Sequence, residues 1–364
     1  MNPSNLKSKD FKLAFSQTLK DYVTGIVWSG DGSTLAVTSA VGEVVLYQDN
    51  SLTTLQEGNN HSIDCIDFSH DGLFLATGGQ DGKVRIWQNN RQDNRQNNNL
   101  IATLENTPAW IDKLVWNPVN HQLAFGVGKQ LQVWDADSHE IVAKLNFANS
   151  SILGIDWRFD GRYIAASGHR GIKVWDGQNW DKEPFILDIP SATIVMGWSS
   201  DGKYLASSNM DRTITLVETE SLLSGQELEP WVMRGFPGKI RRLDWSKVNT
   251  SAGTPLLATT SVDGIVVWDK SDDENVGWEA QVLTNHVDIV QAIAFAPNSL
   301  DLASAGSDQW LCVWENAKQV SQIITGVDAA FSCVSWHPQG DKIAAGSVAG
   351  ELRVWEKPVV TVNN

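Results

Sequence analysis

Residue types that can form a hydrolytic triad occur within one short segment of the chain, at His286, Ser304 and Asp308. An imidazole can serve as a general base toward a hydroxyl while a carboxylate orients its ring, which is the chemistry of acyl transfer. Ser304, however, lies in the apolar run Leu302–Gly306, which predicts a strand interior rather than an exposed loop. We therefore expect a structural role for these side chains, and no catalytic residues are predicted.

Metal-binding chemistry has one weak candidate in the sequence. Cys65 and Cys333 occupy the same strand position in two repeats, with His61 and His337 four residues to either side. A zinc site needs its ligand atoms within about 2.3 Å of one ion. Because the blades of these two repeats are not neighbours, since the first blade lies between them, we expect buried or channel-facing thiols, with no metal and no cofactor.

The elements that must position these residues are repeats, each marked by an aromatic residue that closes a short apolar strand. The spacing is about 40 to 50 residues, a period typical of stacked small sheets that complete one another. The closing residues are Tyr47, Trp87, Trp134, Trp175, Trp268, Trp314 and Trp355, with Val217 in the same place in one further copy. Eight repeat units follow, at residues 21–50, 51–92, 99–136, 140–178, 184–218, 230–270, 278–316 and 319–357.

Each unit contains short β-branched and aromatic runs separated by turn residues. In the second unit, the runs Ile63–Phe68 and Leu73–Thr77 flank Asp71-Gly72, and Val84–Trp87 follows a second turn. Asp-Gly between such runs is typical of antiparallel hairpins. A more variable fourth strand follows each aromatic. We predict an all-β fold, a single β-propeller over residues 1–364 with eight four-stranded blades; seven blades plus an irregular unit are the alternative.

The repeats resemble those of the WD40 family, and the seventh copy carries the clearest match: His286, then Leu302–Asp308, then Cys312-Val313-Trp314-Glu315. The resemblance implies a network of His286, Ser304, Asp308 and Trp314 that satisfies buried polar groups. In the second copy it implies the same role for Thr77, Asp81 and Trp87, although Asn59 stands where the histidine is expected. It also implies a scaffold for protein–protein interaction.

Closure of the ring needs a strand from outside the eight units. Leu13, Phe15, Gln17 and Leu19 alternate with other residues in the period of a strand. We predict that residues 11–20 form the fourth strand of the last blade, which removes two exposed sheet edges. The competing strand is Val359–Val362, within an otherwise irregular tail at residues 358–364; Pro358 at its start makes it the weaker candidate.

Composition disfavours some classes of binding partner and location. The chain has 43 acidic and 28 basic side chains and a net charge of −15, which disfavours binding to nucleic acid. Three cysteines without a CxxC motif fit a reducing compartment, and no apolar run approaches the roughly 20 residues of a membrane helix. We expect a cytoplasmic protein that does not insert into a membrane.

Long connections at residues 88–99, 219–229 and 270–277 all follow third strands, so the opposite end of the propeller keeps short loops. We call that end the short-loop face. The family resemblance implies that partners contact residues just before the first strand and just before the turn between the second and third strands. The candidate residues at or next to these positions are Tyr22, Gln80, Trp110, His169, Met210, Lys239, Arg241, Ile289 and Ser307.

Large apolar residues among them predict a surface that binds one or more proteins, unless some of them pack inward over the channel mouth. The sequence does not predict the oligomeric state. The alternative function is an enzyme or small-ligand binder at the channel mouth around His169, Lys239 and Arg241, although no glycine-rich phosphate loop, H-E-x-x-H or G-x-S-x-G motif occurs. A nucleic-acid-associated subunit is the second alternative.

Overall fold

Short antiparallel strands make up almost all of the regular structure. The computed structural model describes residues 10–89, 99–148, 150–225, 228–273 and 275–358. Within these ranges it contains the strands β1 to β30 and the short helix α1. The competing strand predicted at Val359–Val362, most of the predicted tail and most of the long connection at 88–99 lie outside the described residues.

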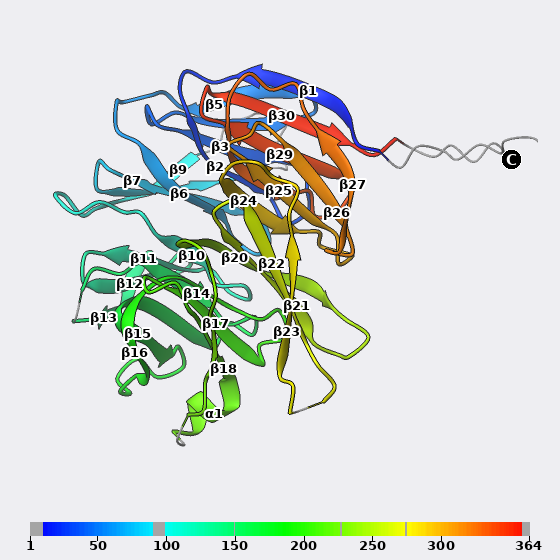
Figure 1. The fold of residues 1–364 in the computed structure, drawn as a ribbon. Helices are drawn as coiled ribbons and strands as arrows, with labels where there is room; N and C mark the ends of the chain where they lie inside the picture. The colour runs from blue at the N-terminus through cyan, green and yellow to red at the C-terminus, as the bar shows by residue number, and fades with distance from the viewer. Residues whose placement is uncertain (1–9, 90–98, 149, 226–227, 274, 359–364) are drawn as a thin grey trace, which may run out of the picture.

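The described strands form seven hydrogen-bonded sheets, of which six have four strands each (Figure 1). In these sheets the strand order follows the chain, except that β1 joins the last one. The six sheets are β2 (Val23–Trp28), β3 (Leu35–Ser39), β4 (Val44–Gln48) and β5 (Ser51–Gln56); β6 (Ile63–Phe68), β7 (Phe74–Gly79), β8 (Lys83–Gln88) and β9 (Asn99–Glu105); β10 (Leu114–Trp116), β11 (Gln122–Val127), β12 (Gln130–Asp135) and β13 (Glu140–Asn146); β20 (Ile240–Asn249), β21 (Pro255–Ser261), β22 (Gly264–Lys270) and β23 (Trp278–Leu283); β24 (Val290–Phe295), β25 (Leu302–Gly306), β26 (Leu311–Glu315) and β27 (Gln319–Ile324); and β28 (Phe331–Trp336), β29 (Lys342–Ser347), β30 (Glu351–Glu356) and β1 (Lys12–Thr18).

The seventh sheet has six strands. They are β14 (Gly154–Trp157), β15 (Tyr163–Asp176), β16 (Phe185–Trp198), β17 (Tyr204–Asn209), β18 (Ile214–Glu218) and β19 (Trp231–Met233). The expectation of eight separate four-stranded blades is therefore corrected: the count of seven sheets matches the alternative of seven blades with an irregular unit.

The length of β15 and β16 explains this difference. Arg170 and Gly171 have φ angles of +67° and +102°, so the chain turns within β15 without leaving the sheet. β16 pairs with β15 through its first half and with β17 through its second half, and no loop separates the halves. Parts of two predicted repeats, 140–178 and 184–218, thus share one sheet.

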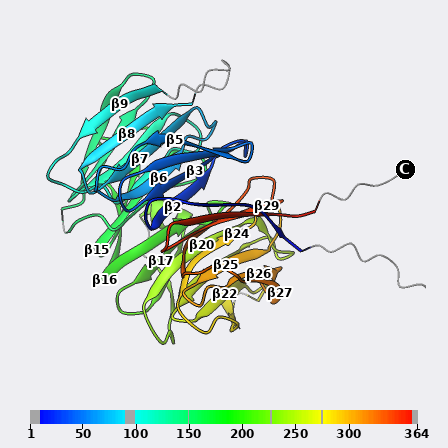
Figure 2. The same cartoon turned by 90° about the horizontal axis from the view of Figure 1, so that it is seen from above.

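Burial depends on the position of a strand within its sheet. Second strands such as β7 are buried along their whole length, whereas outer strands such as β1 and β23 are largely exposed. The first strands contact one another around the ring, in the order β2, β6, β10, β14, β16, β20, β24, β28 and back to β2. The six-stranded sheet contributes two strands to this series, β14 and β16. Figure 2 shows the sheets from above. The ring is therefore closed around an axis that the first strands line.

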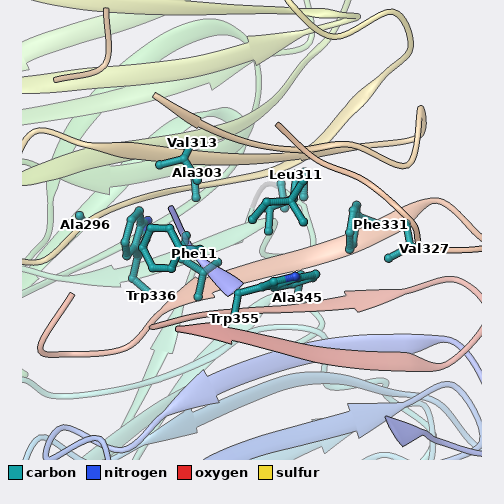
Figure 3. Close-up of a cluster of buried hydrophobic side chains, with 14 residues drawn as sticks. Phe11, Ala296, Ala303, Leu311, Val313, Val327, Phe331, Trp336, Ala345 and Trp355 are labelled. Atoms are coloured by element: carbon teal, nitrogen blue, oxygen red, sulfur yellow. The ribbon is translucent and has the colours of Figure 1, made fainter. Parts of the chain in front are cut away.

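The hydrophobic core lies between successive sheets rather than in one central cluster. One such cluster joins the sheets β24–β27 and β28–β30 through Leu311, Val313, Phe331, Trp336 and Trp355 (Figure 3). One neighbouring cluster joins the sheets β20–β23 and β24–β27, and another joins the last sheet, β28–β30, to the first, β2–β5. Each sheet is consequently stabilised by apolar burial against the sheets on both sides.

The N-terminal strand β1 pairs antiparallel with β30 and becomes the outer strand of that sheet, blue beside red in Figure 1. The register shifts between Leu13 and Phe15, which is a bulge that disturbs the predicted alternation. As a result Leu19 is buried and Phe15 half-buried, but Leu13 is 52% exposed. Of the alternating apolar residues, Leu13 therefore does not contribute to the core.

Carboxylates on three first strands tie neighbouring first strands together. Asp67, Asp156 and Asp244 each accept a hydrogen bond from a backbone N–H of the next first strand. The donors are Trp116, Trp198 and Phe295, at 2.8, 2.9 and 2.7 Å respectively. These bonds satisfy amides that the edge of a first strand would otherwise leave open.

The connection after β18 contains the helix α1 (Thr219–Ser224), where the sequence predicted only a loop. Leu222 of this helix is buried against the six-stranded sheet, which explains why the segment is ordered. In the described part of the chain, no helix is both long and apolar enough to span a membrane.

Candidate functional site

Backbone hydrogen bonds place the two predicted sets of positions side by side on the short-loop face. In several sheets the residue before the turn donates its N–H to the carbonyl of the residue before the first strand. The N···O distances are 2.9 Å for Ala40–Tyr22, Gln80–Ser62, Met210–Ala192 and Val348–Ala330, and 2.8 Å for Ser307–Ile289. Side chains from both sets therefore share one continuous surface.

Exposed apolar side chains gather on this face. Trp110 precedes β10 and is 63% exposed, while Met210, in the turn between β17 and β18, is 49% exposed. Val262 and Val348 occupy corresponding turns of other sheets, and Val287 lies just before β24. Single exposed apolar groups are ordinary, but several on one face indicate a surface suited to protein contact.

Trp110 borders a hollow of about 390 Å³ between two sheets. The backbone on either side of Trp110 is fixed, because Ile111 donates its N–H to the carbonyl of Gly79 and Ala109 donates to Asn106. The hollow is lined by Pro108, Ala109, Trp110, Asp112, Gly126, Gly128, Ser151, Ile152 and Leu153. A large exposed indole beside a mostly apolar hollow is the kind of pair that anchors a partner side chain.

Tyr22 and Ile289 differ from the expectation of exposed apolar side chains, since both are half-buried. Burial and the neighbouring Cys333 raise the pKa of Tyr22, and the Arg242 guanidinium opposes them. Arg242 donates from Nε to the carbonyl of Gln291 at 2.8 Å, which carries it across to the next sheet. Tyr22 is therefore influenced by residues of two other sheets, Cys333 and Arg242.

The polar candidates on this face are more dispersed. Gln80, His169, Lys239 and Arg241 are exposed. Ser307 is half-buried and accepts a hydrogen bond from the amide of Gln291 at 2.9 Å. Across the described ranges, no hydrogen bond or ion pair joins His169 to Lys239 or Arg241; the N–H of His169 donates instead to Ser150.

His286, Ser304, Asp308 and Trp314 form a hydrogen-bonded chain. His286 Nδ1 lies 2.8 Å from an Asp308 carboxylate oxygen and Nε2 lies 2.8 Å from Ser304 Oγ, which also accepts from Trp314 Nε1 at 2.8 Å. Ser304 is fully buried within β25. Its hydroxyl is thus occupied by two partners and closed to solvent, which does not suit a nucleophile.

The corresponding residues of the second repeat do not form such a network. Asn59 Nδ2 reaches Asp81 at 3.3 Å, and Arg85 donates to the same carboxylate at 2.7 Å. Thr77 is buried, yet its hydroxyl has no hydrogen-bond partner among the described residues. The expected role of Thr77, Asp81 and Trp87 as one network is corrected: the shorter Asn59 bonds Asp81 but not the Thr77 hydroxyl.

All three cysteines are free thiols. Cys65 donates to the carbonyls of Gly78 and Ile111, at 3.5 and 3.3 Å. Burial raises the pKa of Cys312 to about 12 and that of Cys333 to about 11. These two thiols therefore stay protonated at neutral pH, which makes them poor nucleophiles.

The structure instead brings together His70, Asp71 and His121, which the sequence did not single out. Their ligand atoms lie within 4.8 Å of one another at the end of the sheets opposite the short-loop face. Burial would raise the pKa of Asp71, but hydrogen bonds from His121, Leu73 and Ser69 lower it to about 2. Burial would lower the pKa of His121, but the Asp71 and Asp137 carboxylates raise it.

Sequence comparison finds a repeat family across much of the chain. Residues 49–88, 140–176, 191–217, 277–315 and 319–356 match the family described as WD domain, G-beta repeat. The matched segments include the buried network around Ser304 and the Met210 turn. They do not include Trp110 or Tyr22.

Individual relatives match over a shorter length. The F-box-like/WD repeat-containing protein TBL1X of Mus musculus is 32% identical over 110 residues, which is 30% of this chain and 20% of the relative. TBL1Y of Homo sapiens has the same identity over the same shares, and human TBL1X is 31% identical. The similarity thus spans about a fifth of the length of these relatives.

Proposed function

Because this chain belongs to the WD40-repeat family, we propose that it is a protein-interaction scaffold, an adaptor that presents its short-loop face to one or more partner proteins. The relatives share WD repeats with it, but the similarity covers about a fifth of their length. Their partners therefore do not transfer to this chain, and the proposal rests on its own surface.

The exposed Trp110 beside its apolar hollow carries this proposal. Interfaces gain most of their affinity from a few aromatic anchors set in pockets, with polar residues around them. Trp110 has the exposure and the neighbouring hollow of such an anchor. Met210 supplies a flexible apolar side chain on the same face, and the exposed Gln80 and Lys239 supply a polar rim.

A non-enzymatic role is part of the proposal. The triad-like residues are buried in a network that satisfies their polar atoms. The residues of the candidate small-ligand site, His169, Lys239 and Arg241, are not joined to one another by any hydrogen bond in the described residues. We also place the protein in the cytoplasm, an assignment supported by three thiols that remain free.

Affinity capture from the native source tests the proposal. The wild-type chain is compared with Trp110→Ala and Met210→Ala, and with Phe159→Ala as the matched control. Phe159 is 49% exposed in the turn between β14 and β15, at the opposite end of the sheets. We expect partners of the wild type to be retained by the control and depleted at least tenfold in the Trp110 variant. Equal capture by all variants would refute a partner-binding role for this face.

A further inference from the structure

His70, Asp71 and His121 come from two neighbouring sheets and meet at the face opposite the short-loop face. His70 and Asp71 lie in the turn between β6 and β7, and His121 lies directly before β11. Their ligand atoms are within 4.8 Å of one another, and His121 Nε2 is 2.9 Å from Asp71 Oδ2. We propose that these three side chains bind a zinc ion that clamps the two sheets together.

The turn that contains Asp71 orients its carboxylate for metal binding. One carboxylate oxygen, Oδ1, accepts hydrogen bonds from Ser69 Oγ at 2.7 Å and from the N–H of Leu73 at 3.0 Å. Gly72 has a φ of +70°, which closes the turn. The other oxygen, Oδ2, is left to point toward His121. The carboxylate is therefore oriented before any ion arrives.

His121 is oriented from three sides. Its Nδ1 lies 3.0 Å from Asp137 Oδ1, its Nε2 faces Asp71, and the ring of Phe74 packs edge-on at 5.0 Å. A neutral imidazole that donates from Nδ1 to a carboxylate directs its Nε2 lone pair outward, the arrangement that metal-binding histidines commonly have. In the ion-free chain His121 Nε2 hydrogen-bonds to Asp71 Oδ2 at 2.9 Å, and a zinc ion bound by both atoms would take the place of the proton between them.

His70 supplies the third ligand. Its ring stacks on that of His121 with centroids 5.4 Å apart and an interplanar angle of 29°. His70 is exposed, so rotation of its side chain meets little resistance and can bring a ring nitrogen into bonding distance. Two imidazoles and one carboxylate suit zinc, whereas calcium and magnesium prefer sites made of oxygen alone. Three protein ligands leave a fourth position for water.

Calorimetric titration of the untagged, chelator-treated chain with zinc tests the site. We expect one ion per chain, with affinity reduced at least tenfold in His70→Ala and in His121→Ala. Asp137→Ala, which removes the orienting carboxylate, should weaken binding about 10- to 100-fold. His61→Ala is the matched control, because His61 is an exposed histidine in a turn on the short-loop face, and it should bind as the wild type does.

A second measurement separates binding from folding. Melting curves without zinc show whether each variant is folded; His70→Ala is the decisive one, because the exposed His70 makes only a ring contact in the described structure. Zinc should raise the melting temperature of the wild type and not that of His70→Ala. Binding that both histidine variants retain, or no saturable binding by the wild type at millimolar zinc, would overturn the proposal and leave His121 as a bridge between two carboxylates.

Discussion

Gln322 hydrogen-bonds to the backbone of Phe11 through both the oxygen and the nitrogen of its side-chain amide. Its Oε1 accepts from the N–H of Phe11 at 2.8 Å, and its Nε2 donates to the carbonyl of Phe11 at 2.9 Å. Phe11 in turn packs edge-on against Trp336 at 5.6 Å, in the cluster of Figure 3. The N-terminal segment is thus bound to β27 of one sheet and, through β1, to β30 of the next.

Phe11→Ala should destabilise the chain strongly because Phe11 is buried between two sheets. Removing a core phenylalanine costs about 3–5 kcal/mol. Leu13→Ala is the matched control, since Leu13 lies two residues further along, in β1, but is 52% exposed, and it should cost less than about 1 kcal/mol. Urea unfolding measures both. Similar losses for the two variants would contradict the closure described here.

Ser304→Ala should cost about 1–3 kcal/mol, because it leaves His286 Nε2 and Trp314 Nε1 without their shared hydrogen-bond partner. Thr77→Val at the corresponding place of β7 is the control. The Thr77 hydroxyl has no partner among the described residues, so its loss should be neutral or stabilising. Denaturant melts of the two variants decide the matter, and a larger loss for Thr77→Val would show that the second repeat has a network after all.

The repeats show what sequence reasoning can and cannot predict. The repeat period, the hairpins and the WD40-type residues of the seventh copy are local patterns, and they sufficed for the propeller class. The six-stranded sheet was not predictable, because its cause is the unbroken strand β16, which pairs with β15 through its first half and with β17 through its second half. Periodicity alone does not reveal where the loop between two strands is missing.

The candidate surfaces illustrate the same limit. Trp110 was identified from its position before a first strand, and its exposure follows from the backbone bonds around it. Tyr22 holds a similar position but is half-buried, and its pKa is influenced by Arg242, a residue far away in sequence. His70 and His121 meet only because neighbouring sheets place two distant turns side by side. Contacts between sheets are set by packing angles that no single repeat encodes.

Asp67→Asn should change how stability depends on pH. Burial raises the pKa of Asp67 to about 7, although backbone hydrogen bonds from Trp116 and Phe68 oppose the shift. The folded chain therefore holds this proton more tightly than the unfolded chain, where an aspartate titrates near 4. The stability that Asp67 contributes is complete below about pH 4 and is lost as the pH rises toward about 7.

Asparagine at this position can still accept the hydrogen bond from the backbone N–H of Trp116, but it does not ionise. Asp67→Asn should thus be about as stable as the wild type near pH 4, and more stable by on the order of a few kcal/mol near pH 8. Urea unfolding at both pH values gives the comparison. Parallel stability curves for the two chains between pH 4 and pH 8 would show that Asp67 titrates as an ordinary surface aspartate.

The short-loop face as a partner-binding surface is tested most directly by the dissociation constant of a captured partner for the wild type, Trp110→Ala and Phe159→Ala. Truncation of an aromatic anchor typically costs 2 kcal/mol or more, which is about a thirtyfold loss of affinity. We expect that loss for Trp110→Ala and unchanged affinity for Phe159→Ala. Unchanged affinity for Trp110→Ala, or an equal loss at Phe159 on the opposite face, would contradict the account.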